Sequence, residues 1–126
     1  MDNKFIPAME RTPEVDFRFS DHHLSMKGES YPEDAASFFG PLLQVLAEYC
    51  ERARGQEVQV EFQLEYFNTS SAKALMNMIQ MLESAAQGGV RIDLRWCFQK
   101  EDEVIREFGE DFATELEHVH FQLVEI

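Results

Sequence analysis

Basic residues are scarce in this chain. Lysine and arginine together number 11 against 24 aspartates and glutamates, so the formal net charge at pH 7 is −13. No Lys/Arg run could neutralise a nucleic-acid backbone, and the same negative field disfavours anionic membrane surfaces. The composition therefore predicts no nucleic-acid partner and no membrane partner, and it favours proteins with basic or apolar docking surfaces.

Cysteines and long apolar runs are also scarce. The two cysteines, Cys50 and Cys97, form neither a CxxC pair nor a metal-binding spacing. We interpret them as buried free thiols of a reducing compartment. No apolar run approaches the ~20 residues of a membrane-spanning helix, and the N-terminus lacks the pattern of a signal peptide. We therefore expect a cytoplasmic protein.

Sequence signatures of catalysis are missing too. GxSxG, P-loop, HExxH and GxGxxG motifs do not occur. His118 and His120 are expected to share one face of a strand, but no carboxylate or cysteine has a convincing ligand spacing beside them. We predict no metal, no cofactor and no catalytic residue. A small enzyme that uses these two histidines is the weakest alternative.

The composition is that of a globular protein. At 126 residues, with 44% hydrophobic and 12% aromatic residues, the chain is expected to form one domain over residues 1–126. Apolar periodicity predicts strands near 15–19, 24–26, 58–66, 90–98 and 119–123, and helices over 33–54, 70–87 and 102–116. Residues 1–13 are expected to be irregular or a short edge segment. The first helix either kinks at Pro41 or begins near it.

The predicted order is β-β-α-β-α-β-α-β, an α/β fold with a mixed, partly parallel sheet. Strands buried on both faces are apolar throughout, whereas these strands are apolar on one face only. The helices should therefore pack on one face of the sheet. The other face should be solvated, with Glu61 and Glu65 available for pairing with Arg91 and Arg95.

The junction between the strand predicted over 58–66 and the helix predicted over 70–87 is the most informative part of the sequence. The strand over 58–66 alternates, with Val58 and Tyr66 at the ends of its inward-facing set, and it leads directly into a helix. Thr69, Ser70 and Ser71 lie at the junction. A helix N-terminus has unpaired N–H groups and a positive dipole, so a phosphate on one of these hydroxyls would be stabilised there. The alternative is that Asn68, Thr69 or Ser70 simply caps the helix.

The helix that follows is apolar over more of its surface than packing requires. Its core stripe is predicted to be Ala72, Leu75, Met76, Ile79, Leu82 and Ala86. An adjoining stripe of Ala74, Met78, Met81 and Ala85 suits an adaptable docking surface, because methionine is flexible. Burial between neighbouring elements is the alternative. Lys73, one turn after Thr69, could reach a phosphate or an acidic group of a partner.

Three ordered motifs extend over the chain: GESYPE (28–33), LEYFNTSSAK (64–73) and QGGVRIDLRW (87–96). With them the chain resembles the SiaC family of bacterial regulatory phosphoproteins. The resemblance implies a fold similar to STAS domains, the anti-sigma-factor antagonists. It also implies phosphorylation of the NTS threonine, Thr69, by a Ser/Thr kinase and its reversal by a metal-dependent, PPM-type phosphatase.

The resemblance further implies that the unphosphorylated form binds and activates a diguanylate cyclase, which raises cyclic di-GMP and promotes aggregation or biofilm growth. Partner contacts are then expected from the residues around Thr69 and along the helix: Asn68, Ser70, Ser71, Lys73, Met78 and Met81. An anti-sigma-factor antagonist is an alternative, although NTSSAK lacks the glycine of the DSxG-like stretch. A constitutive adaptor, in which Thr69 only caps a helix, is the other.

Overall fold

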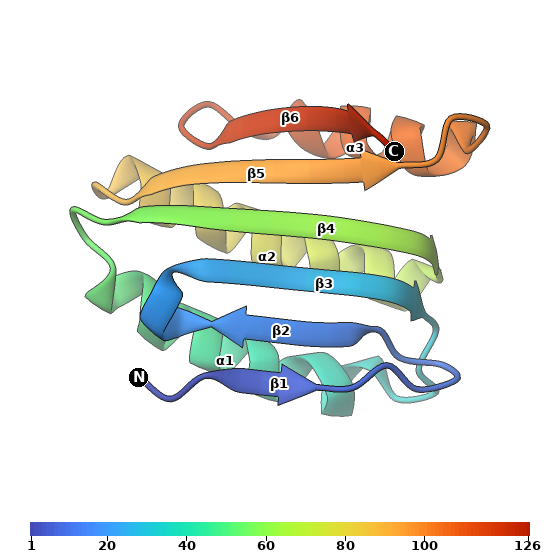
Figure 1. Ribbon diagram of the computed structural model, residues 1–126, viewed down its shortest axis with the longest axis horizontal. Helices are drawn as coiled ribbons and strands as arrows, with labels where there is room; N and C mark the ends of the chain where they lie inside the picture. The colour runs from blue at the N-terminus through green and yellow to red at the C-terminus, as the bar shows by residue number, and fades with distance from the viewer.

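The computed structural model describes all of residues 1–126 and contains one six-stranded sheet and three α-helices (Figure 1). The elements are β1 (Lys4–Ile6), β2 (Glu14–Arg18), the short 3-10 helix η1 (Phe19–Asp21), β3 (His23–Ser30), α1 (Ala35–Arg52), β4 (Glu57–Phe67), α2 (Thr69–Gln87), β5 (Arg91–Phe98), α3 (Glu103–Ala113) and β6 (His120–Glu125). The strands lie in the sheet in chain order. β1, β2 and β3 pair antiparallel, whereas β3 to β6 pair parallel.

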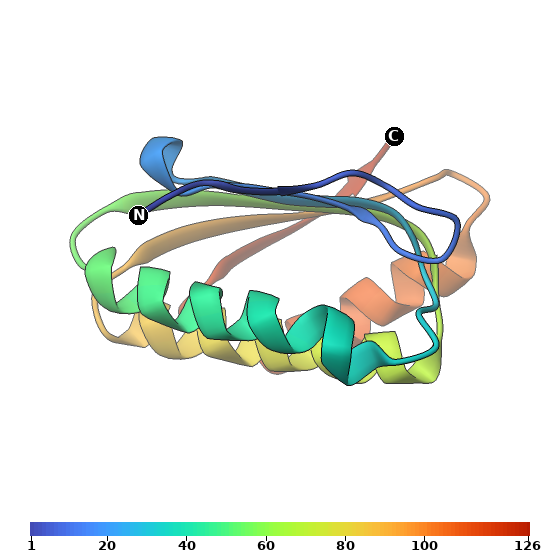
Figure 2. The same ribbon diagram turned by 90° about the horizontal axis from the view of Figure 1, so that it is seen from below.

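All three α-helices lie on the same face of the sheet (Figure 2). Each helix connects two adjacent parallel strands, and the chain moves across the sheet in one direction only. When every crossover connection has the same handedness and leads to the next strand in the same direction, all the helices lie on the same side of the sheet. The predicted α/β fold with one-sided helix packing is therefore confirmed.

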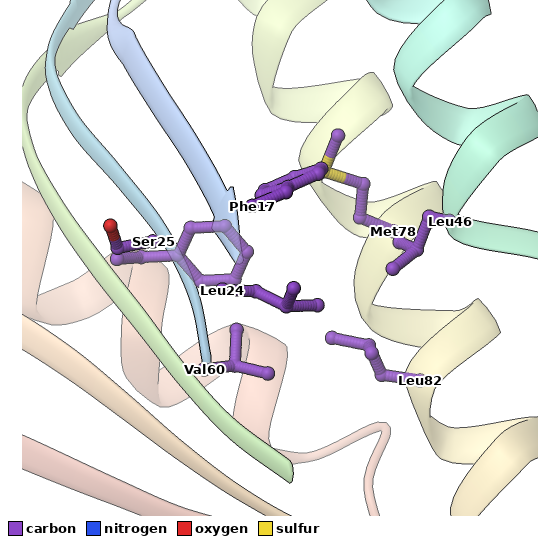
Figure 3. Close-up of a pocket in the computed structure, with 8 residues that line it drawn as sticks. Phe17, Leu24, Ser25, Leu46, Val60, Met78 and Leu82 are labelled. Carbon is purple, nitrogen blue, oxygen red and sulfur yellow. The ribbon is translucent and has the colours of Figure 1, made fainter. Parts of the chain in front are cut away.

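The core lies between the sheet and these helices and contains 28 buried hydrophobic residues. Figure 3 shows a small cavity within it, where side chains from the sheet meet those of α1 and α2. Phe17, Leu24 and Val60 come from the sheet, Leu46 comes from α1, and Met78 and Leu82 come from α2. The apolar residues that alternate along the strands thus form a single core layer between the sheet and the helices.

The opposite face of the sheet carries ion pairs. Glu61 lies 3.7 Å from Lys27 and 3.9 Å from Arg95, its register partner on β5. The predicted Glu61–Arg95 pairing is confirmed. Arg91 instead pairs with Glu57 at 3.2 Å, because these two residues are opposite in the ladder.

Two features differ from the sequence prediction at the N-terminal half. The chain begins with β1, a short edge strand that the predicted element order did not count. α1 starts at Ala35, where the Asp34 side chain accepts a hydrogen bond from the Ser37 N–H at 3.1 Å, and it continues through Pro41. Of the two alternatives for this helix, a start near Pro41 is therefore wrong. The missing proline N–H is tolerated because Pro41 lies on the exposed side.

A β-bulge reverses the alternation at the end of β4. Gly28 pairs with Leu64 but Glu29 pairs with Tyr66, so Glu65 is an extra residue in the ladder. Leu64 and Phe67 are buried, whereas Tyr66 is 52% exposed. The prediction that Tyr66 faces the core is wrong, because strict alternation does not survive the inserted residue.

α3 approaches the sheet closely at Gly109. A Cβ atom at this position would lie 2.4 Å from Cδ1 of Trp96 and 2.7 Å from a methyl group of Leu123. The indole is held in place, because its Nε1 donates to the carbonyl of Ile105 at 2.8 Å. Glycine is required here for packing and not for backbone conformation.

We expect Gly109→Ala to lower the free energy of unfolding by about 1–3 kcal/mol, because the added methyl group overpacks a rigid contact. Glu107→Ala, an exposed position on the same helix, should change it by less than about 0.5 kcal/mol. Urea unfolding followed by tryptophan fluorescence measures both. Equal stability of the two variants would contradict the close approach.

Candidate functional site

Asn68 supplies the N-cap of α2. Its side-chain oxygen accepts a hydrogen bond from the Ser71 N–H at 2.9 Å, and its backbone carbonyl accepts one from the Ala72 N–H at 2.9 Å. The cap is anchored to the sheet, because the Asn68 N–H donates to the carbonyl of Ser30 at 3.0 Å. One side chain is enough to cap a helix, so the hydroxyl of Thr69 is not used for this purpose.

Ser71 is buried beneath the cap. Its hydroxyl lies 2.8 Å from the hydroxyl of Ser30, and both residues are 0% exposed. Each hydroxyl has the other as its hydrogen-bond partner, so neither buried group is left unsatisfied. Ser71 was expected to contact a partner, and in the structure its side chain is buried at the junction between β4 and α2.

Thr69 and Ser70 are exposed in the first turn of α2. Their backbone N–H groups have no acceptor within the helix, because first-turn donors lack a preceding carbonyl. Lys73 follows one turn later and is also exposed. The structure therefore brings together an accessible hydroxyl, free N–H donors, the positive end of the helix dipole and a lysine.

Tyr66 lines two depressions beside this helix end. The first is lined by Tyr66, Phe67, Asn68, Thr69, Ala72 and Phe108. The second is lined by Glu29, Tyr31, Pro32, Glu33, Tyr66, Asn68 and Ser70. Sequence reasoning missed these aromatic residues, because the bulge exposes Tyr66 and only tertiary packing places Phe108 of α3 beside Thr69.

The predicted partner-binding residues of α2 divide into two groups. Met78 is 1% exposed and points into the core among the side chains of Figure 3. Met78 was expected to contact a partner, and in the structure its side chain packs between the sheet and Leu46 of α1. Met81 is only half-buried, and it lines a depression between the two helices.

His118 does not lie in a strand, since β6 begins at His120. Its ring nitrogen Nδ1 lies 2.8 Å from the Glu83 carboxylate, which also accepts the N–H groups of His118 and Val119. Partial burial alone would raise the pKa of Glu83, but these hydrogen bonds outweigh it and lower the pKa to about 2. Glu83 thereby fastens the segment before β6 to α2. No group of three or more potential metal ligands gathers in the structure.

Both cysteines are free. Burial raises the pKa of the Cys50 thiol to about 11. Burial, followed by the nearby Glu61 carboxylate, raises the pKa of Cys97. Thiols with raised pKa values are poor nucleophiles at neutral pH, so neither cysteine adds chemistry to the site.

Fold and site together define a small α/β protein that presents an unengaged threonine hydroxyl at a helix N-terminus. No helix is long and apolar enough to cross a membrane. The chain matches the family described as SiaC family regulatory phosphoproteins over residues 6–126.

Relatives and solved structures agree with this match. An uncharacterized protein of Pseudomonas aeruginosa (strain UCBPP-PA14) is 35% identical over 116 residues, which cover 91% of this chain and 90% of that protein. The crystal structure of apo-SiaC from Pseudomonas aeruginosa superposes with a TM-score of 0.89 at 30% identity, covering 98% of this chain and 99% of that one. SiaC in complex with the diguanylate cyclase SiaD, of which it is the activator, gives a TM-score of 0.90 at 30% identity and the same coverage. The chain belongs to the SiaC family of regulatory phosphoproteins.

The cap assignment predicts a difference between neighbouring substitutions. Asn68→Ala should lower the free energy of unfolding by about 1 kcal/mol, because the Ser71 N–H loses its acceptor. Thr69→Ala should change it by less than about 0.5 kcal/mol. Chemical denaturation followed by circular dichroism measures both variants. A loss in Thr69→Ala as large as that in Asn68→Ala would assign the capping role to Thr69 after all.

The Glu83 contact predicts a pH-dependent stability. The folded-state pKa of about 2 lies below the usual 4.5, so the carboxylate stabilises the fold fully above about pH 4.5 and loses this effect as the pH falls toward 2. At about pH 6 we expect Glu83→Gln to lower the free energy of unfolding by about 1–3 kcal/mol. The difference in the free energy of unfolding between Glu83→Gln and wild type should become smaller as the pH is lowered toward 2. Glu48→Gln, the same change at an exposed position on α1, is the control. If the destabilisation by Glu83→Gln did not depend on pH, the stabilising role of the Glu83 carboxylate would be contradicted.

Proposed function

We propose that this protein is a phosphorylation-controlled partner-switch protein whose unphosphorylated form binds and activates a diguanylate cyclase. Activation raises cyclic di-GMP and thereby promotes aggregation or biofilm growth. The protein acts as a regulator and not as an enzyme, in the cytoplasm, where cyclic di-GMP is made. The SiaC–SiaD complex of Pseudomonas aeruginosa supports the choice of partner.

The position of Thr69 is the observation that carries this proposal. The hydroxyl is exposed, it lies in the first turn of α2, and Asn68 performs the capping that would otherwise explain its presence. Ser71 is inaccessible to a kinase. Within the NTSS segment, Thr69 and Ser70 are the exposed hydroxyl residues, and the resemblance of this segment to the NTS motif of the family favours Thr69.

A phosphate on Thr69 would be compatible with the fold. It adds about −1.5 to −2 charges and three acceptor oxygens. The free N–H groups of the first turn and the helix dipole stabilise this charge, and Lys73 lies within reach one turn later. The same dianion would be costly to desolvate in an interface, so it blocks a partner without refolding the domain.

The switch requires two opposing enzymes. A Ser/Thr protein kinase adds the phosphate and a PPM-type phosphatase removes it. Thr69 is exposed and lines one of the depressions beside Tyr66, which supports access of both enzymes to it. Neither a metal nor a cofactor of this protein takes part.

The first test is direct mapping of the phosphate. We expect incubation with the cognate kinase and ATP to add one phosphate to wild type, located on Thr69 by mass spectrometry, and none to Thr69→Ala. Ser70→Ala, which removes the neighbouring exposed hydroxyl, should still accept one. A phosphate that persists in Thr69→Ala would move the site to Ser70, and none in wild type would favour the constitutive adaptor.

Affinity for the cyclase is measured by titration calorimetry with the SiaD-like diguanylate cyclase of the source organism. Thr69→Ala should bind as wild type does, and Thr69→Glu should bind at least about tenfold more weakly, equivalent to about 1.4 kcal/mol. Equal affinities of Thr69→Ala and Thr69→Glu would contradict the charge mechanism.

A further inference from the structure

β6 forms one edge of the sheet and pairs with a strand on one side only (Figure 1). The N–H of Ile126, directly after β6, donates to the carbonyl of Phe98 at 2.9 Å. Backbone groups alternate in direction along a strand, so those of the even-numbered residues point toward β5. The N–H and C=O groups of Phe121, Leu123 and Glu125 therefore point away from the sheet, and they form a row with which another strand can pair.

The two edge strands of the sheet differ in their protection against such pairing. β1 has only three residues, it carries Lys4, and Pro7 follows it. Short length, lysine and proline all hinder the addition of a strand. β6 has six residues without lysine, proline or a bulge, and its one carboxylate, Glu125, is at its end. An edge strand of this kind is a site of association unless another surface covers it.

The helix-facing side chains of β6 are incompletely covered. Phe121 and Leu123 are opposite the buried Leu94 and Trp96 of β5, so they point toward the helix layer. Phe121 is half-buried and Leu123 is 39% exposed, because no strand lies on their other side. Apolar side chains on an added strand would complete their burial.

α3 packs beneath this edge of the sheet. Gly109 faces Leu123, since a Cβ atom at Gly109 would lie 2.7 Å from a Leu123 methyl group. Phe108 lines a depression together with Thr69, so it marks the side of α3 that faces α2. The side of α3 opposite Phe108 is therefore the one next to the edge of the sheet.

That side of α3 carries two opposite charges. Arg106 and Glu110 are each two residues from Phe108, which places both about 200° around the helix from it. They lie 3.4 Å apart, and both side chains are at least half exposed. A surface with one positive and one negative group can match a second copy of itself, because a two-fold axis sets each group against the other.

We infer that β6 pairs antiparallel with β6 of a second copy of this chain, about a two-fold axis at Gln122. In this register Phe121 of one copy is opposite Leu123 of the other, and both side chains face the helix layer. The outward backbone groups of these two residues then bond one another. A two-fold axis one residue later would instead set Phe121 opposite Glu125. The register about Gln122 is the one that matches apolar side chains with each other.

The same axis sets α3 against its copy. Because Gly109 lies beside the centre of β6, the axis passes near the middle of α3 and the two helices are antiparallel. Arg106 of each copy then faces Glu110 of the other. Thr69 lies on the other side of α3 and remains accessible in both copies. The pairing goes beyond the proposed function and does not depend on it.

Sedimentation equilibrium measures the association. At about 0.3 M NaCl, repulsion between two chains of net charge −13 is screened beyond roughly 6 Å. We expect twice the 14.7 kDa mass of the chain at about 0.1 mM protein, because a small interface of this kind corresponds to a Kd of about 10 μM. A monomer at this concentration would overturn the inference.

A charge on the two-fold axis tests the register. Gln122→Lys sets two ammonium groups directly opposite each other, where like charges destabilise a strand pair. The dimer Kd should rise at least about tenfold. Gln44→Lys, the same change at an exposed position on α1, should associate as wild type does. Circular dichroism establishes that both variants are folded, and an unchanged Kd for folded Gln122→Lys would overturn the pairing.

Exchange of the α3 charges tests the contact between copies. Arg106→Glu and Glu110→Arg each leave like charges facing one another across the axis, so each variant alone should dimerise more weakly than wild type. Mixed in equal amounts, the two variants restore opposite charges at both contacts and should form a heterodimer, which native mass spectrometry distinguishes by mass. An ion pair within one helix cannot cause this recovery, because neither chain contains both charges. Undiminished homodimers of either variant, or no heterodimer on mixing, would overturn the inference.

Discussion

Burial on a single face of the sheet is the constraint on which the rest of this structure depends. Each strand presents one apolar and one polar face, so only one layer of helices can cover the sheet. Because the strands lie in chain order and the helical connections share one hand, α1 and α2 become parallel neighbours. Met78 of α2 is buried between this helix layer and the sheet.

The same arrangement positions Thr69. β4 and β3 end together, so the Ser30 carbonyl and hydroxyl meet Asn68 and Ser71 at the start of α2. These contacts hold the N-terminal end of α2 against β3 and do not involve Thr69. The Thr69 hydroxyl is held in place but makes no contact that the fold requires. A charged group could therefore be added to it without loss of the fold. That separation of roles is what a reversible chemical switch requires.

Much of this organisation could be predicted from local patterns. The alternation of β4, the helical period of α2 and the Asn68–Ser71 cap signal are short-range features, and they placed Thr69 near the helix N-terminus. The one-sided apolar character of the strands also predicted the side on which the helices pack. The three sequence motifs, NTSSAK among them, also predicted the family to which the chain belongs.

The sequence by itself thus determined the strand and helix pattern, the one-sided core and the location of the hydroxyl cluster, because each depends on residues within a turn or two of one another. Tertiary structure decided which hydroxyls are accessible and which surface remains uncovered. Ser71 and Met78 have side chains that suit a partner, yet Ser71 is buried against Ser30 and Met78 is buried in the core. The bulge at Glu65 likewise exposed Tyr66 through pairing with a distant strand. Burial depends on neighbours from elsewhere in the chain, and no local pattern specifies them.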